Sequence, residues 1–173
     1  EVWAHPFMAL RDYQVGIRFS YKDSVYWLND ERPEIEVRPE SFTRIYKFRR
    51  AYLTETISAS HDKPVSIINY EYRGVYPAKL VIKFRSNIRY MWPYSEKVFS
   101  SINYSTDKEL NSFILKDGSG EHIILTGAVR KPLQSIIGQY ENFEKKDSLF
   151  TGIASSDFSV GALTEYELKM NDN

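Results

Sequence analysis

The histidines are the first residues to examine for catalysis or metal binding. The chain has three of them, His5, His61 and His122, and no cysteine. They lie far apart in the sequence, and none has a second histidine at the spacing that metal sites use. His5 precedes a proline, His61 lies in the turn signal HDKP, and His122 begins a predicted strand. We therefore interpret all three as structural or solvated residues and predict no metal site and no cofactor.

Carboxylate pairs are the second group to consider, since glycoside hydrolases work with two carboxyl groups. Glu34 and Glu36 share one face of a predicted strand, as do Glu165 and Glu167 in another. In both strands they occupy the polar half of an alternating pattern, which is typical of a solvated face. The chain also lacks the G-x-S-x-G nucleophile motif, the Walker A loop and the dinucleotide fingerprint. The sequence therefore predicts no catalytic residue within this chain.

A cluster of aromatic residues around Pro93 is the feature best suited to binding. It occupies the stretch NIRYMWPYSE, residues 87–96. Tyrosine and tryptophan combine a large apolar face with a polar tip, which suits protein interfaces and sugar-stacking platforms. The predicted carbohydrate-binding or interface residues are Arg89, Tyr90, Trp92, Tyr94 and Trp3. Aromatic residues in regular strand alternation, such as Tyr13 and Tyr21, are interpreted instead as part of an aromatic core.

Strands must position these residues, because apolar and polar side chains alternate along most of the chain. Strands are predicted at residues 13–21, 25–28, 35–37, 42–48, 52–60, 65–72, 79–86, 113–116, 122–127 and 162–170. The DGSG sequence at 117–120 predicts a tight hairpin turn. Strands that recur about every ten residues between turn signals favour an antiparallel arrangement. We predict an all-β fold, an antiparallel two-sheet β-sandwich. Its predicted core residues are Phe19, Phe48, Phe84, Ile67 and Leu80.

One segment breaks the two-residue period. Apolar side chains between Leu133 and Phe143 recur at helical spacing, which predicts a short helix near residues 132–145. Gly138 in its middle costs about 1 kcal/mol of helix propensity relative to alanine, so a non-helical segment remains an alternative. No repeat, linker or low-complexity tract divides the chain, and we predict a single domain over residues 1–173.

Charge and hydropathy exclude several classes of partner. Lysine plus arginine and aspartate plus glutamate both total 23, so the chain lacks the basic excess that nucleic-acid binders usually show. No run of about 18 apolar residues is present to span a membrane, and the first residues lack the pattern of a signal peptide. The absence of cysteine fits a reducing compartment, and we predict a cytoplasmic location. Because the chain begins without a methionine, we expect it to be an excised piece of a longer protein.

Three segments together resemble a known family. They are WAHPFMALRDYQVGIRF at 3–19, IEVRPESFTRIY at 35–46 and NIRYMWPYSE at 87–96. Their order is similar to that in the N-terminal β-domain of glycogen-debranching-type (amylo-alpha-1,6-glucosidase-like) glycoside hydrolases. In that group an aromatic-His-Pro opening, an E-V-R-P-E segment and an Arg/Leu-Met-Trp-Pro segment follow one another. The chain departs from that pattern at Ala4, between the aromatic residue and the histidine, and at Tyr90, before the methionine.

The resemblance implies a β-sandwich that precedes an (α/α)6-barrel catalytic domain cleaving α-glucosidic bonds, with the acid and base carboxylates in the barrel. This chain has no long succession of amphipathic helices that could form such a barrel. We therefore expect the chain to be inactive by itself, as the N-terminal fragment of a larger glycoside hydrolase that acts on α-glucans.

Three functions are compatible with these patterns. The first is a non-catalytic accessory domain that packs on the barrel of the same polypeptide and helps to shape its carbohydrate cleft. The second is a stand-alone carbohydrate-binding module that stacks α-glucan on Trp92, Tyr94 and Trp3, with Tyr90 next. The third is a dimerisation or protein-interaction module, since Arg89, Tyr90, Met91 and Trp92 are of the types enriched in interface cores. We rank the three hypotheses in that order.

Overall fold

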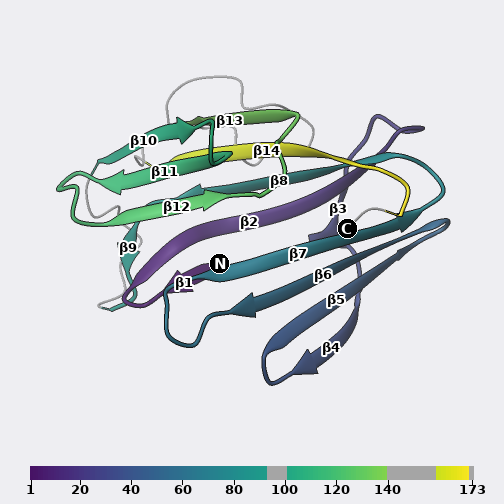
Figure 1. The fold of residues 1–173 in the computed structure, drawn as a ribbon, viewed down its shortest axis with the longest axis horizontal. Helices are drawn as coiled ribbons and strands as arrows, with labels where there is room; N and C mark the ends of the chain where they lie inside the picture. Colours follow the sequence, from purple (N-terminus) through teal and green to yellow (C-terminus); the bar gives the residue numbers. More distant parts are fainter. Residues whose placement is uncertain (93–100, 140–158, 172–173) are drawn as a thin grey trace. The chain divides into compact units, whose positions relative to one another are not determined.

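A computed structural model describes residues 1–92, 101–139 and 159–171 of the chain (Figure 1). Its strands are β1 (Val2–Ala4), β2 (Phe7–Phe19), β3 (Tyr26–Trp27), β4 (Glu34–Arg38), β5 (Ser41–Phe48), β6 (Ala51–Ala59), β7 (Ser66–Gly74), β8 (Ala78–Ser86), β9 (Arg89–Tyr90), β10 (Ile102–Asp107), β11 (Ser112–Asp117), β12 (Ile123–Gly127), β13 (Gln134–Gly138) and β14 (Val160–Leu168). A short 3-10 helix, η1 (Leu28–Asp30), follows β3. The prediction of an all-β fold is therefore confirmed for the described residues.

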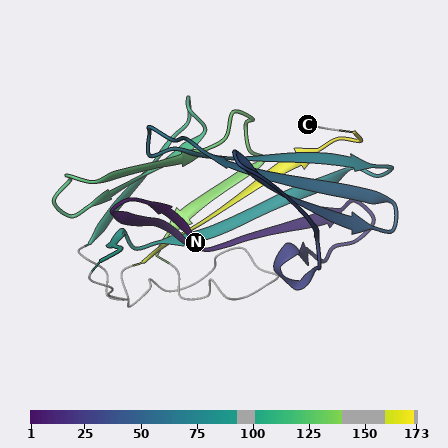
Figure 2. The same ribbon diagram turned by 90° about the horizontal axis from the view of Figure 1, so that it is seen from below.

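The described strands form three antiparallel sheets. The largest has the strand order β1-β2-β8-β14-β13, and β3 and β9 also pair with β2. The second sheet has the order β10-β11-β12, and the third has the order β4-β5-β6-β7. Both views show β1 folded back on the first part of β2 (Figures 1 and 2). The predicted hairpin at 117–120 joins β11 to β12, which pair in antiparallel register.

Contacts between residues divide the chain into two compact units. Unit 1 comprises Glu1–Gln14 and Val81–Tyr166, and unit 2 comprises Val15–Leu80 and Glu167–Asn173. The division passes through β2, β8 and β14, so each of these strands contributes residues to both units. The single domain proposed from the sequence stays a prediction.

In unit 1 the three-stranded sheet packs face to face on part of the largest sheet. Phe113 of β11 lies in one buried cluster with Leu10 of β2 and Phe84 of β8. The rings of Phe84 and Phe113 meet edge to face with their centroids 6.2 Å apart. A second buried cluster joins Leu115 of β11 to Val160 of β14. Each such side chain contributes about 1.5–3 kcal/mol to stability when it is fully buried. Two sheets that face each other across such clusters form the layers of a β-sandwich.

In unit 2 aromatic rings join the four-stranded sheet to the end of β2. The Phe48 ring of β5 lies 5.4 Å from the Phe19 ring and 6.0 Å from the Tyr26 ring, centroid to centroid, at steep angles. Such pairs contribute about 0.5–1.5 kcal/mol beyond the area that they bury. Tyr72 of β7 is completely buried, and its hydroxyl donates to the Tyr76 carbonyl at 2.6 Å.

The predicted core is confirmed in most positions and wrong in two. Phe19, Phe84 and Leu80 are buried, and Phe48 is half-buried. Ile67 is exposed, because β7 is an edge strand and Ile67 shares its outer face with polar neighbours. Tyr21 lies beyond the end of β2, where it is exposed and contacts the rings of Phe19 and Tyr76 at the surface.

Two further expectations need correction. Residues 134–138 form β13 rather than the start of a helix, because β14 offers a register of antiparallel partners from Gln134 to Gly138. The β-branched pair Ile136 and Ile137 also favours a strand, and residues 140–145 lie outside the described part. Glu165, expected in solvent, is buried, because β14 lies between β8 and β13 and nearly all of its residues are covered.

Candidate functional site

Three adjacent strands of unit 1 position the predicted binding residues. β1 and β9 both pair with the start of β2, so that Trp3 lies opposite Met8 and Met8 lies opposite Arg89. Residues directly opposite each other on antiparallel strands point to the same face of the sheet. Trp3, Met8 and Arg89 therefore form one cross-strand row, which brings two of the three family-like segments side by side.

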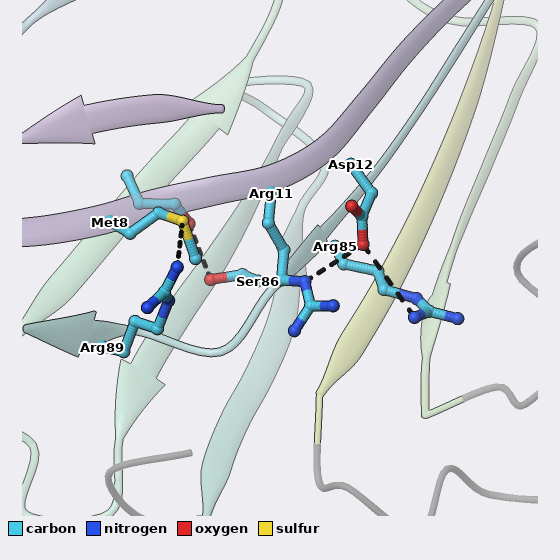
Figure 3. A network of polar contacts seen from close by, with 7 residues as sticks. Met8, Arg11, Asp12, Arg85, Ser86 and Arg89 are labelled. Atoms are coloured by element: carbon cyan, nitrogen blue, oxygen red, sulfur yellow. Dashed lines mark hydrogen bonds and ion pairs between the residues drawn. The ribbon is translucent and has the colours of Figure 1, made fainter. Parts of the chain in front are cut away.

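Arg89 is held inside this row and is only 5% exposed. Its guanidinium carbon lies 5.6 Å from the centroid of the Trp3 ring, and its Nη2 lies 3.5 Å from the Met8 sulfur (Figure 3). The Trp3 indole nitrogen donates to the Glu1 carboxylate at 3.1 Å. A guanidinium over an indole face contributes about 0.5–2 kcal/mol, more where water is excluded. Arg89 thus fixes the Trp3 ring and does not face solvent, where a ligand would meet it.

The chain reaches β9 through a strained and buried corner. Ile88 is buried and has a φ of 40°, a value that β-branched residues rarely adopt. The neighbouring Asn87 amide is also buried, and neither of its polar atoms makes a hydrogen bond with the described residues. Before the corner, the Ser86 hydroxyl donates to the Ala9 carbonyl at 2.7 Å (Figure 3). These buried groups fix the direction in which β9 leaves β8, which sequence patterns do not reveal.

Tyr90 points to the opposite face from Arg89, because consecutive strand residues alternate. Its ring centroid lies 4.7 Å from that of Phe7, its cross-strand partner, and 6.2 Å from that of His122. The ring centroids of Phe7 and His122 are 4.2 Å apart. Tyr90 therefore belongs to an aromatic cluster with the β11–β12 hairpin, and does not form one surface with Arg89.

A buried carboxylate organises that hairpin. Asp117 accepts hydrogen bonds from the Ser119 hydroxyl at 2.6 Å and from the His122 amide at 3.0 Å, and its Oδ2 lies 3.1 Å from the His122 Nδ1. The Ser119 hydroxyl, the His122 amide and then the His122 ring hold the pKa of Asp117 well below its usual range. Because the serine hydroxyl contacts the carboxylate and not the imidazole, the arrangement is that of a braced turn rather than of an activated nucleophile.

Among the described residues that were predicted to bind, Trp92 projects into solvent. It lies two residues beyond the end of β9 and is 84% exposed, and Met91 between them is also exposed. The Met91 amide donates to the Pro6 carbonyl at 2.7 Å, which ties this end of β9 to the loop after β1. β9 ends at Tyr90, just before Met91, and Tyr94 lies outside the described residues.

An ion cluster lies further along β2 and β8 (Figure 3). Asp12, at a φ of 50°, pairs with the Arg11 Nε at 3.0 Å and lies 3.9 Å from the Arg85 Nη1. All three side chains are partly exposed, so this cluster has the character of a solvated ion pair that faces water at a bend in β2.

A separate concavity of about 810 Å³ lies in unit 2, on the outer face of the four-stranded sheet. It is lined by Ile45, Arg50, Tyr52, Thr54, Glu71, Arg73, Gly74, Val75, Met170 and Asn171. Tyr52 and Arg73 are cross-strand partners here, and both are exposed. Of the residues predicted to bind, the four that the structure describes (Arg89, Tyr90, Trp92 and Trp3) do not line this concavity. Sequence patterns missed it because it is built from the polar halves of three different strands.

The ranges 1–92, 101–139 and 159–171 contain no group of three or more histidine, aspartate or glutamate side chains placed to hold a metal ion. Nothing helical in those ranges has the length and apolar character that crossing a bilayer requires. Comparisons of the chain with protein-family models, with curated proteins and with solved structures found no match.

Proposed function

We propose that this chain is a non-catalytic accessory module of a glycogen-debranching-type α-glucosidase. In this proposal it packs on an (α/α)6-barrel of the same polypeptide, and the end of β9 forms part of the contact and of the carbohydrate cleft. The proposal rests on the resemblance of the three segments and on one observation, the exposure of Trp92 two residues beyond the paired strand β9.

Trp92 carries the argument because leaving a large aromatic side chain in water is unfavourable in free energy compared with burying it. It is 84% exposed, yet the backbone next to it is fixed by β9 pairing with β2 and by the Met91–Pro6 hydrogen bond. Exposed aromatic side chains on a fixed backbone are typical of surfaces that bind another molecule, since little ordering entropy remains to be lost. A neighbouring domain that covers Trp92 would recover about 1.5–3 kcal/mol.

The environment of Trp92 favours packing over stand-alone sugar binding. A sugar platform needs polar side chains beside the aromatic ring, to bond the hydroxyl groups of the sugar. Arg89, the polar residue expected to do this, is buried against Trp3 and Met8. Tyr90 contacts Phe7 and His122 instead. These contacts support the accessory-domain hypothesis more than the carbohydrate-binding one.

Tryptophan fluorescence tests the proposal, because the three tryptophans differ in exposure. Trp27 is buried, Trp3 is half-buried and Trp92 is exposed, so acrylamide should quench mainly Trp92 in the 173-residue chain. Replacement Trp92→Phe identifies that component. We expect the component to lose most of its quenching when the chain is expressed together with the polypeptide that follows it in its gene.

Two results would contradict the proposal. One is a Trp92 component that stays equally quenchable in the longer protein. The other is release of glucose from maltooligosaccharides by the 173-residue chain alone. A change in Trp92 emission on adding millimolar maltoheptaose to the chain, absent in Trp92→Phe, would favour the carbohydrate-binding module instead.

A further inference from the structure

The edge strand of the four-stranded sheet in unit 2 is unusually open. β4 pairs with β5 on one side, and no described strand pairs with its other side (Figure 1). All five of its residues are exposed. Ile35 and Val37 are 61% and 72% exposed, although they lie opposite Arg44 and Phe42 on the face where Tyr46 and Phe48 pack. β4 therefore presents unpaired backbone groups together with two apolar side chains.

Residues of matching or complementary type lie at equal distances on either side of the centre of this strand. The sequence reads PEIEVRP over residues 33–39, with Glu36 in the middle and a proline at each end. If a second copy of β4 pairs with it antiparallel about a two-fold axis at Glu36, each Glu34 lies opposite the Arg38 of the other copy. The isoleucine then lies opposite the valine on the apolar face. A two-fold interface requires such reciprocal pairs, and the prolines end the ladder at the same point on both copies.

The charges on the outer face of β4 balance in that arrangement. Arg38 pairs with Glu36 of its own strand at 2.7 Å, and Lys47 of β5 forms an ion pair with Glu34. In the paired arrangement the two Glu36 carboxylates lie opposite each other at the axis, which by itself is unfavourable, and the Arg38 that pairs with each of them offsets this repulsion. Each copy adds two carboxylates and two cations, so the network is neutral. Opposite charges directly across an antiparallel pair are favourable.

Edge strands usually carry devices that prevent such pairing. Typical devices are very short strands, charged side chains or prolines on the edge, charges that point inward, or a bulge. β4 carries charges only on its outer face, where a second copy supplies opposite charges to Glu34 and Arg38; its inward positions are Ile35 and Val37, the prolines flank the strand without interrupting it, and the register with β5 is regular. We propose that two copies of this chain associate through antiparallel pairing of β4 with β4 about Glu36, which joins their four-stranded sheets into one. This contact uses residues of unit 2 alone and does not depend on the proposed role of Trp92.

Complementary charge reversals test the pairing. In a dimer of the Glu34→Arg variant, the new arginine of each copy lies opposite the Arg38 of the other copy. In a dimer of the Arg38→Glu variant, the new glutamate of each copy lies opposite the Glu34 of the other copy. Each variant alone should raise the dissociation constant of the dimer about tenfold, because two favourable pairs become repulsive. An equimolar mixture of the two variants restores both opposite-charge pairs, and its dissociation constant should return to within about threefold of the original. The side chains are exposed, so neither variant should unfold.

Sedimentation velocity of the 173-residue chain, from about 10 µM to about 1 mM, covers the range of weak interfaces. Glu40→Arg, a charge reversal just beyond the ladder, is the matched control and should associate like the original chain. Hydrogen exchange of the backbone amides of residues 34–38 should become slower as the dimer forms. The replacement Trp92→Ala should not change the dissociation constant of the dimer or this slowing. A chain that stays monomeric over this whole concentration range overturns the proposal. The expected partner of β4 would then be a strand of a different protein. Association that neither reversal weakens, or that the mixture fails to restore, also overturns it.

Discussion

The replacement Glu55→Gln tests whether a buried ion pair stabilises the four-stranded sheet. Glu55 of β6 is 2% exposed, and its carboxylate pairs with the Arg44 Nε of β5 at 2.5 Å. The other oxygen accepts a hydrogen bond from the Tyr70 hydroxyl of β7 at 2.8 Å. One carboxylate therefore links three neighbouring strands. Glutamine preserves the shape of the side chain and removes its charge, so the guanidinium loses its counter-ion.

The expected cost follows from burial. A hydrogen bond to a charged group contributes about 1.5–3 kcal/mol, whereas an exposed pair contributes about 0–1 kcal/mol. Arg44 is 32% exposed, so water recovers part of the loss. We expect Glu55→Gln to lower the free energy of unfolding by about 2 kcal/mol, or the melting temperature by about 4–8 °C in a chain of this length. Glu55→Ala, which also leaves a cavity, should cost about 3–5 kcal/mol.

Urea unfolding followed by circular dichroism measures these differences. Glu71→Gln is the matched control, because Glu71 lies on the outer face of the same sheet and its oxygen is 3.9 Å from the exposed Arg73 guanidinium. That variant should change the free energy of unfolding by about 0.5 kcal/mol or less. Equal effects of Glu55→Gln and Glu71→Gln would refute the reasoning. So would a double variant, Arg44→Met with Glu55→Leu, that is less stable than Glu55→Ala, because matched apolar side chains should replace a buried pair at little cost.

Three further replacements have defined outcomes. A Cβ at Gly74 would lie 2.2 Å from the buried Tyr72 hydroxyl, so Gly74→Ala should cost about 1–3 kcal/mol in the same urea assay; a neutral result would mean that the ring moves freely. The pKa of Asp117 is lower in the folded than in the unfolded chain, so its carboxylate stabilises the fold above about pH 4 and this stabilisation is lost as the pH falls below that value. Asp117→Asn should therefore lower the melting temperature at pH 7 and lower it less at pH 3, whereas Glu121→Gln in the same turn should show no such difference. Trp92→Ala should change the free energy of unfolding by about 0.5 kcal/mol or less, since the side chain is exposed; a loss above about 2 kcal/mol would show that Trp92 supports the fold.

Local signals in the sequence predicted those elements whose neighbours along the chain determine them. Pro39 ends β4, and the DGSG turn fixes the β11–β12 hairpin. The two-residue period gave β5 to β8 with ends displaced by one or two residues. These features depend on turn chemistry and on strand alternation, which a few consecutive residues specify.

Local sequence patterns did not predict the features that depend on residues far away in the sequence. Glu165 has the alternation of a half-exposed strand, and only the position of β14 between two neighbours buries it. The local pattern of residues 133–138 is compatible with a helix or a strand, and the antiparallel pairing with β14 decides for the strand. The candidate site shows the same limit. The binding role of Trp92 stays a prediction, and Arg89 and Tyr90 were grouped together although alternation alone places them on opposite faces of β9.

The contact between Trp3 and Arg89 has a consequence for recognising relatives of this chain. The indole and the guanidinium meet across β2, so the opening segment and the NIRYMW segment act as one structural unit although most of unit 2 separates them in sequence. A lysine at position 89 would lack the planar group that stacks on the ring, so changes at the two positions should be correlated among relatives. A sequence profile that scores an aromatic residue at position 3 jointly with an arginine at position 89 should therefore detect distant relatives better than one that scores either segment alone.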